Sequence, residues 1–279
     1  MDLKNKFLLL LKTSRPIFWI VQPLIFLISL FISGAELSIL ALVQLVFLSF
    51  PYCIFLYGIN DVYDYESDRL NPRKNLVEGI KLKPKYHKFI KKVSYYIMGV
   101  LILLSLITFN LTNIIGMVLL LFFSYFYSAP PIRLKVLPPL DSFANGMLYI
   151  YAPALLGFSF GGTILDFPTK AYFVIACGIG FHAMSTIPDY TADKKVGDRT
   201  FAIVFGKRSA VVFALIIFLI TLFFSGIQNL AANYYLIACI LVALVLLIKP
   251  SEKLSLYLLK TLFAGFVLLG IIFLVSGLV

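Results

Sequence analysis

The acidic residues of this chain gather in two short stretches. Seven of the 13 acidic residues lie there: Asp61, Asp64, Glu66, Asp68, Asp189, Asp193 and Asp198. In the first stretch, NDVYDYESD, Asn60, Asp64 and Asp68 follow one another at intervals of four residues. In the second, DYTAD, Asp189 and Asp193 repeat this interval. Residues four apart share one face of a helix, so each stretch predicts a row of oxygen ligands at a helix end.

A row of like charges on one helix face is unfavourable unless a cation lies among them. Carboxylate and amide oxygens without nearby Cys or His pairs favour a hard cation, and Mg²⁺ commonly adds waters and substrate phosphates to such ligands. We therefore expect Mg²⁺, as two ions that bridge a diphosphate and balance its growing charge as it departs. The alternative is that these carboxylates only solvate helix ends among lysines.

Basic side chains beside the two clusters could complete a clamp on the diphosphate. They are Arg69, Arg73, Lys74, Arg133, Lys135, Lys194 and Arg199. The spacing does not decide which of them contact the ligand.

The elements that position these residues are membrane-spanning helices. Of the 279 residues, 61% are hydrophobic and 13% charged, which is too apolar for a soluble domain. Apolar runs of about 20 residues predict nine spans in an all-α, polytopic membrane bundle around a central cavity. The whole chain, 1–279, is read as one domain. The predicted spans are 17–34, 38–58, 93–110, 112–128, 143–163, 171–188, 209–226, 231–248 and 257–278.

The net charge of +11 follows the predicted topology, which argues against nucleic acid as the partner. With a cytoplasmic N-terminus and an outside C-terminus, every one of the 24 basic residues except Lys170 falls on the inner side. Spans two and six then run in the same direction, so both acidic clusters emerge on the cytoplasmic face. The expected location is a prokaryotic plasma membrane, with residues 1–16 as an interfacial lead-in.

The motifs resemble those of the UbiA superfamily of intramembrane prenyltransferases. NDVYDYESD is similar to the NDxxDxxxD motif, DYTAD to the DxxxD motif, and YSAPPIRLK at 127–135 to the segment that follows the fourth helix in many members. The resemblance implies that Asn60, Asp64, Asp68, Asp189 and Asp193 contact a Mg²⁺–diphosphate assembly, and that Asp61 belongs to the same motif. It also implies further contacts to the diphosphate or acceptor: Tyr127, Arg133, Lys135, Arg69 and Lys74. Asp198 falls outside the DxxxD core and is assigned a structural role.

Longer stretches, including FHAMSTIPDYTADKKVG, look most like the lycopene elongase branch. This resemblance implies transfer of a prenyl group from dimethylallyl diphosphate to lycopene. The alternative is an aromatic-acceptor enzyme of quinone synthesis, and chlorophyll-type or ether-lipid-type acceptors stay open. The partners implied are a prenyl diphosphate donor, a lipophilic acceptor and membrane lipids.

Two further polar residues lie within predicted spans. His182 precedes Asp189 by seven residues and shares its helix face, so it is a candidate for positioning the acceptor or taking up its proton. A histidine hydrogen-bonded inside the bundle is the alternative. Asn145, four residues after Asp141, is a candidate for binding substrate, whereas Asp141 is equally explained as a helix cap.

The main rival to an enzyme is a transporter or channel. Carriers place ionisable groups near the bilayer midplane, but the middle of every predicted span lacks formal charge. A membrane scaffold has no need of paired acidic motifs. The pattern Gly157 and Gly161 in GFSFGG predicts close helix packing instead of a site.

Overall fold

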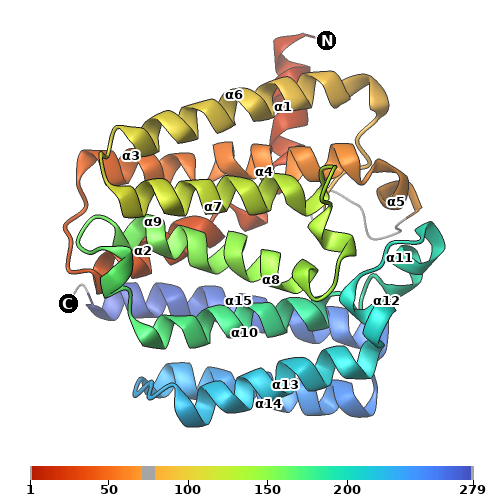
Figure 1. Ribbon diagram of the computed structural model, residues 1–279. Helices are drawn as coiled ribbons and strands as arrows, with labels where there is room; N and C mark the ends of the chain where they lie inside the picture. The colour runs from red at the N-terminus through yellow and green to blue at the C-terminus, as the bar shows by residue number, and fades with distance from the viewer. Residues whose placement is uncertain (1, 71–78, 278–279) are drawn as a thin grey trace. The chain divides into compact units, whose positions relative to one another are not determined.

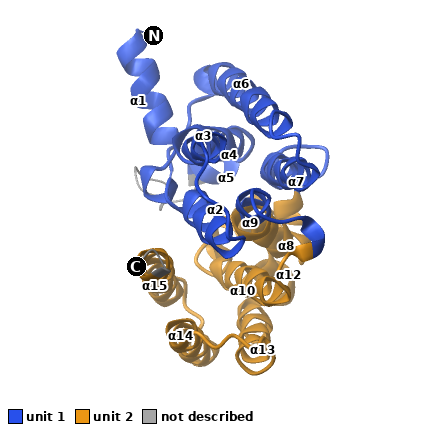
Figure 2. Ribbon diagram, turned by 90° about the vertical axis from the view of Figure 1, so that its left-hand side faces the viewer, with its two compact units in different colours: residues 1–133, 152–165 blue, residues 134–151, 166–279 orange. Residues whose placement is uncertain are grey.

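A computed structural model describes residues 2–70 and 79–277, and every regular element in these ranges is a helix (Figure 1). The chain divides into two compact units (Figure 2). Unit 1 comprises residues 1–133 and 152–165, and unit 2 comprises residues 134–151 and 166–279. The prediction of one domain stays a prediction.

Unit 1 carries the first acidic cluster, on α4 and α5. Its helices are α1 (Leu3–Thr13), α2 (Val21–Ile32), α3 (Ile39–Phe47), α4 (Phe50–Tyr63), α5 (Tyr65–Leu70), α6 (His87–Leu106), α7 (Leu111–Ser128) and α9 (Ala152–Phe158). Short 3-10 turns cover Pro16–Phe18 and Pro84–Tyr86.

Unit 2 carries the second acidic cluster, between α10 and α12. Its elements are the turn Leu134–Val136, α8 (Leu140–Gly146), a π-helical segment Met147–Tyr151, α10 (Thr169–Ser185), α11 (Tyr190–Val196), α12 (Phe201–Phe205), α13 (Lys207–Phe224), α14 (Leu230–Ile248) and α15 (Glu252–Gly277). The turn Ile164–Asp166 crosses the unit boundary.

The structure confirms an all-helical membrane protein but not nine spans. Helices occupy all nine predicted ranges. Within the described residues, however, only six segments are individually long and apolar enough to cross a bilayer, and two bent helix pairs raise the number to eight at most. The fifth predicted range is divided among α8, the π-helical segment and α9, none of which reaches the length of a span by itself.

Glycines allow α2 and α9 to pack with their backbones in close contact, as the sequence predicts. A Cβ at Gly157 would overlap the carbonyl oxygen of Phe26, and one at Gly161 would lie 2.5 Å from the carbonyl oxygen of Ser33. In membranes such close approach compensates for the weak hydrophobic driving force between helices, because it increases van der Waals contact.

Buried polar side chains of unit 1 are hydrogen-bonded to one another. The amides of Gln44 on α3 and Asn113 on α7 form two mutual hydrogen bonds of 3.0 Å. Ser105 on α6 donates to Asn113 at 2.8 Å, and Asn113 donates to Ser159 at 2.9 Å. An unpaired polar group costs several kcal/mol in a bilayer, so this network ties α3, α6 and α7 to the segment that follows α9.

The core of unit 2 is apolar and links α10, α13, α14 and α15. Met184, Ala214, Phe218 and Leu246 are among its fully buried residues. Gly180 on α10 lies close to α13, because a Cβ there would stand 3.1 Å from the Cα of Ala214. This packing fixes the direction of α10, whose far end leads into the second acidic cluster.

Replacing Gly157 with alanine is expected to destabilise the protein by about 1–3 kcal/mol, because the new methyl group forces α2 and α9 apart. Gly99 on α6 is the matched control, since a Cβ there meets no atom within 4 Å. Gly99→Ala should be neutral or up to about 1 kcal/mol more stable, as helix propensity predicts. Thermal unfolding of both variants in one detergent measures the difference, and equal stabilities would contradict the close packing.

Candidate functional site

The first acidic cluster lies where α4 passes into α5 in unit 1. Asp64 is the C-cap of α4, and α5 begins at the next residue. Despite this break, the amide of Asp64 bonds to the carbonyl of Asn60 at 2.8 Å, and that of Asp68 to the carbonyl of Asp64 at 2.9 Å. The helical spacing predicted for Asn60, Asp64 and Asp68 is therefore retained across the break. Asp61, Asp64 and Asp68 are all buried.

Asp64 is the centre of a compact polar cluster. Its Oδ2 accepts a hydrogen bond of 2.6 Å from the Asn60 amide and one of 2.8 Å from the Ser128 hydroxyl at the end of α7. The Asn60 amide also donates to Ser128 at 2.8 Å. Arg133 brings its guanidinium within 3.6 Å of the other oxygen, Oδ1. Asn60, Asp64 and Arg133, all predicted site residues, are thus brought together.

Arg15 is a member of this cluster that the sequence did not single out. Its guanidinium lies 2.6 Å from Asp61 Oδ1, donates to Asn60 Oδ1 at 3.3 Å, and stands 4.2 Å from the centre of the Tyr57 ring. The Asp61 side chain has no exposed surface. In the sequence, Arg15 is a charged residue directly before an apolar span. The excess of basic residues on the inner side of membranes is enough to explain such a residue, so nothing in the sequence assigned it to the site.

Both arginines of this cluster adopt left-handed backbone conformations. The φ angle is 50° at Arg15 and 49° at Arg133. Residues other than glycine seldom occupy this region, and they persist there at a cost of about 1–3 kcal/mol only when surrounding contacts hold them. The ion pairs to Asp61 and Asp64 supply such contacts. Backbone strain at two arginines that both face the first acidic motif is typical of a functional site.

The second acidic cluster lies in unit 2, after α10. Pro188 follows the end of α10, and α11 turns away from α10 by 71°. Asp189 is the N-cap residue of α11, and the Asp193 amide bonds to its carbonyl at 2.9 Å. Burial raises the pKa of Asp193 to about 7, and the nearby charge of Asp189 adds to the shift. A site with this charge repulsion is suited to a bound cation.

Lys135 lies beside this second cluster and is largely buried. Its ammonium stands 2.8 Å from Asp198 Oδ2, and its charge acts against the rise in the Asp193 pKa. Thr200 donates a hydrogen bond of 3.1 Å to Asp193 Oδ2. Asp198, assigned a structural role from sequence, is thus the residue that holds Lys135 in place.

The remaining predicted site residues are less closely tied to the clusters. Arg69 pairs with Glu66 at 3.3 Å on an exposed surface, and Lys194 is exposed on α11. His182 is buried on α10, with its Nδ1 atom 3.1 Å from the Ser142 hydroxyl. Tyr127 on α7 is half-buried.

Asn145 is half-buried on α8. Lys74 and Arg73 lie outside the described residues, so their predicted contacts stay predictions.

The donor atoms of the two clusters fit Mg²⁺. They are carboxylate and amide oxygens, the ligands preferred by a hard cation. Within the described residues, no three His, Cys, Asp or Glu side chains form a ready-made metal cage. Mg²⁺ usually takes only one or two carboxylates from a protein and completes its shell with waters and substrate phosphates.

The sequence profile of the UbiA prenyltransferase family matches residues 21–251. The chain belongs to the UbiA prenyltransferase family. This membership confirms the resemblance drawn from the motifs, and with the apolar helices it identifies an integral, multi-pass membrane prenyltransferase. The transporter interpretation finds no support.

Known relatives of this UbiA-family chain are similar over most of its length. A lycopene elongase/hydratase from Haloarcula japonica is 31% identical over 218 residues, which cover 77% of this chain and 72% of the relative. One from Corynebacterium glutamicum is 30% identical and covers 77% and 76%. A UbiA homolog from Archaeoglobus fulgidus, solved with DMAPP and Mg²⁺, shares the fold at a TM-score of 0.67, with 22% identity and coverage of 95% and 99%.

Replacing Arg15 with glutamine is expected to destabilise the protein by about 3–5 kcal/mol, because it takes the paired cation away from a fully buried carboxylate. The double variant Arg15→Gln/Asp61→Asn should recover much of this loss, since no buried charge is left. Arg69→Gln, in the exposed pair with Glu66, should change stability by at most about 1 kcal/mol. Thermal unfolding measures all three, and a double variant less stable than Arg15→Gln would contradict the pairing.

Proposed function

We propose that this UbiA-family enzyme transfers a prenyl group from an allylic diphosphate to a lipophilic acceptor, with dimethylallyl diphosphate as donor and lycopene as acceptor. The observation that carries the proposal is the polar cluster of Asn60, Asp64, Ser128 and Arg133, with Asp64 buried at its centre, in a chain of this family. Similarity to lycopene elongase/hydratases of two organisms supports the acceptor.

In the proposed site, Mg²⁺ would be held by Asn60, Asp64 and Asp68 of the first motif and by Asp189 and Asp193 of the second. Two ions would serve one diphosphate. When bound, Mg²⁺ supplies Lewis-acid stabilisation of the charge that develops on the departing diphosphate. Protonated Asp193 is a poor ligand, so binding requires its proton to leave, and the cation favours that loss.

Basic residues of the proposed site also stabilise the negative charge of the diphosphate. Arg133 faces Asp64, and Lys135 lies beside Asp193, which supports a role for both side chains in binding diphosphate oxygens. Fixed charges of this kind stabilise a leaving group without reorganisation during the reaction. Arg15 holds Asn60 and Asp61 in position and is assigned no contact with the substrate.

The reaction proceeds by ionisation. The bond between the first prenyl carbon and the diphosphate oxygen breaks, and both electrons leave with the diphosphate. A carbon–carbon double bond of the acceptor then supplies the electrons of the new carbon–carbon bond. The resulting carbocation either loses a proton or adds water and then loses a proton. An apolar helical environment protects the allylic cation from bulk water until the acceptor reacts. We place the site on the cytoplasmic side, on the basis of the lysine and arginine distribution.

Substituting Asp64 or Asp189 with asparagine should lower kcat by at least about 100-fold, because each change removes charge that binds Mg²⁺ and stabilises the leaving diphosphate. Glu66→Gln is the matched control: this residue lies in the same motif, but it is exposed and pairs with Arg69. Mg²⁺-dependent release of pyrophosphate from dimethylallyl diphosphate with lycopene measures all three variants. Full activity of both aspartate variants would refute the assignment of the site.

Expression in a lycopene-producing bacterial host tests the acceptor. We expect carotenoids heavier by one or two five-carbon units, detected by mass spectrometry of pigment extracts. The Asp64→Asn variant in the same host is the control and should leave lycopene unchanged. An unaltered carotenoid profile, together with prenylation of an aromatic acid by the same membranes, would replace lycopene with the aromatic acceptor as the substrate class.

A further inference from the structure

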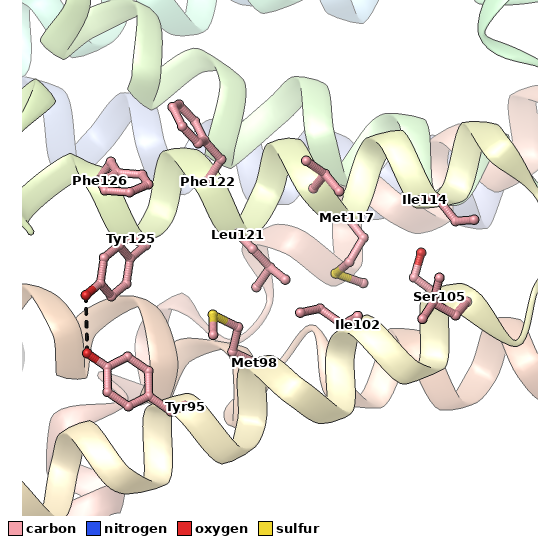
Figure 3. Close-up of a pocket in the computed structure, with 12 residues that line it drawn as sticks. Tyr95, Met98, Ile102, Ser105, Ile114, Met117, Leu121, Phe122, Tyr125 and Phe126 are labelled. Carbon is pink, nitrogen blue, oxygen red and sulfur yellow. Dashed lines mark hydrogen bonds between the residues drawn. The ribbon is translucent and has the colours of Figure 1, made fainter. Parts of the chain in front are cut away.

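An apolar groove of about 520 Å³ runs between α6 and α7 in unit 1 (Figure 3). Met98 and Ile102 of α6 face Met117 and Leu121 of α7 along its length. Ile102, Val118 and Phe122 are exposed, so the groove is open at the surface of the protein. In a membrane protein, a surface of this composition faces the hydrocarbon of the bilayer.

One end of the groove is polar. Figure 3 shows Tyr95 and Tyr125 at this end, and their hydroxyl oxygens lie 3.2 Å apart. Lys91 stands 4.4 Å from the centre of the Tyr63 ring, which itself packs edge-on against Tyr125. Lys88 lies three residues before Lys91, so it occupies the same face of α6. Cations and tyrosine hydroxyls therefore cluster where the apolar groove begins.

These features form one continuous amphipathic stripe on α6. Lys88, Lys91, Tyr95, Met98 and Ile102 recur at intervals of three or four residues, which places them on a single helix face. The stripe passes from charge, through hydroxyl groups, to hydrocarbon. The matching ligand has an anionic headgroup and an apolar chain.

The length of the groove selects among such ligands. Tyr95 at one end and Ser105 at the other are ten residues apart on α6, which corresponds to about 15 Å of helix. The hydrocarbon core of a bilayer is about 30 Å thick, so the groove covers a single leaflet. An acyl chain of one leaflet has this extent, whereas a long linear polyene reaches further.

We propose that the groove between α6 and α7 is a binding site for one phospholipid with an anionic headgroup. Lys88 and Lys91 bind the phosphate, the Tyr95 and Tyr125 hydroxyls hydrogen-bond to the headgroup region, and an acyl chain fills the groove between Met98 and Met117. Basic pockets between membrane helices on the cytoplasmic side recognise anionic lipids in this way.

The lipid site is connected to the first acidic cluster through α7 and through the contact of Lys91 on α6 with Tyr63 of α4. Tyr63, beside Lys91, directly precedes Asp64, and α7 ends at Ser128, which donates to Asp64. A bound lipid would therefore stabilise the position of α7 relative to α4. The lipid site rests on the membrane location of the protein, and it does not depend on the identity of the prenyl acceptor.

Lipid binding is tested by native mass spectrometry of the purified full chain, titrated with phosphatidylglycerol or with phosphatidylcholine. We expect saturable binding of one phosphatidylglycerol and at least tenfold weaker binding of phosphatidylcholine. Lys91→Gln should weaken phosphatidylglycerol binding about fivefold and Lys88→Gln/Lys91→Gln about 25-fold, as expected for a lysine near an anionic headgroup. Lys92→Gln, on the neighbouring exposed face, should leave it unchanged.

A second pair of variants tests the apolar part of the groove. Ile102→Trp fills it and should abolish saturable binding, whereas Leu103→Trp, at an exposed position of α6 that does not line the groove, should not. Equal affinity of the lysine variants and the unaltered protein would overturn the proposal. So would binding of a neutral linear polyene that Ile102→Trp blocks and Lys91→Gln leaves intact, because the groove would then belong to a hydrocarbon acceptor. The lysine variants keep the proposal testable if Ile102→Trp fails to fold, and none of these measurements requires enzyme activity.

Discussion

Repulsion between carboxylates placed at the ends of membrane helices is the constraint on which this structure depends. Asp61, Asp64 and Asp68 are buried close together, where water screens their charges poorly. Arginine side chains from other parts of the chain lie beside these carboxylates and reduce the repulsion between them. Arg15 pairs with Asp61 and Arg133 with Asp64, both from left-handed backbone positions that are costly unless the pairs form. These pairs offset the carboxylate charges only in part, so the cluster can still attract a cation.

The two acidic clusters differ in the groups that surround their carboxylates. In unit 1, hydrogen-bond donors surround Asp64, since Asn60 and Ser128 both donate to its Oδ2. In unit 2, Lys135 is held between Asp198 and the neighbourhood of Asp193, and the pKa of Asp193 is raised to about 7. The second cluster therefore favours an arriving cation, because the cation offsets the repulsion between Asp189 and Asp193.

The apolar body of each unit keeps these polar ends in place. The hydrocarbon core of a bilayer offers no hydrogen-bond partners to polar groups, so the side-chain amides of Gln44 and Asn113 hydrogen-bond to each other. Gly157 lets α9 approach α2 closely, and Gly180 does the same for α10 and α13. Helices packed this tightly tolerate little displacement, which preserves the geometry of the residues at their ends. The α6–α7 groove is an exception, because it leaves apolar surface for a lipid to cover.

The sequence by itself determined the helical membrane class, the two acidic motifs and the family, because these depend on local composition and on spacings within a single helix. It did not settle the number of spans, because the π-helical segment between α8 and α9 divides one predicted range and has no signal in hydropathy. Only the tertiary structure decided which groups partner the carboxylates. Arg15 meets Asp61 from 46 residues away, and Ser128 meets Asp64 from 64 residues away. Such contacts arise from the packing of whole helices against one another, a non-local property that no spacing along the chain records.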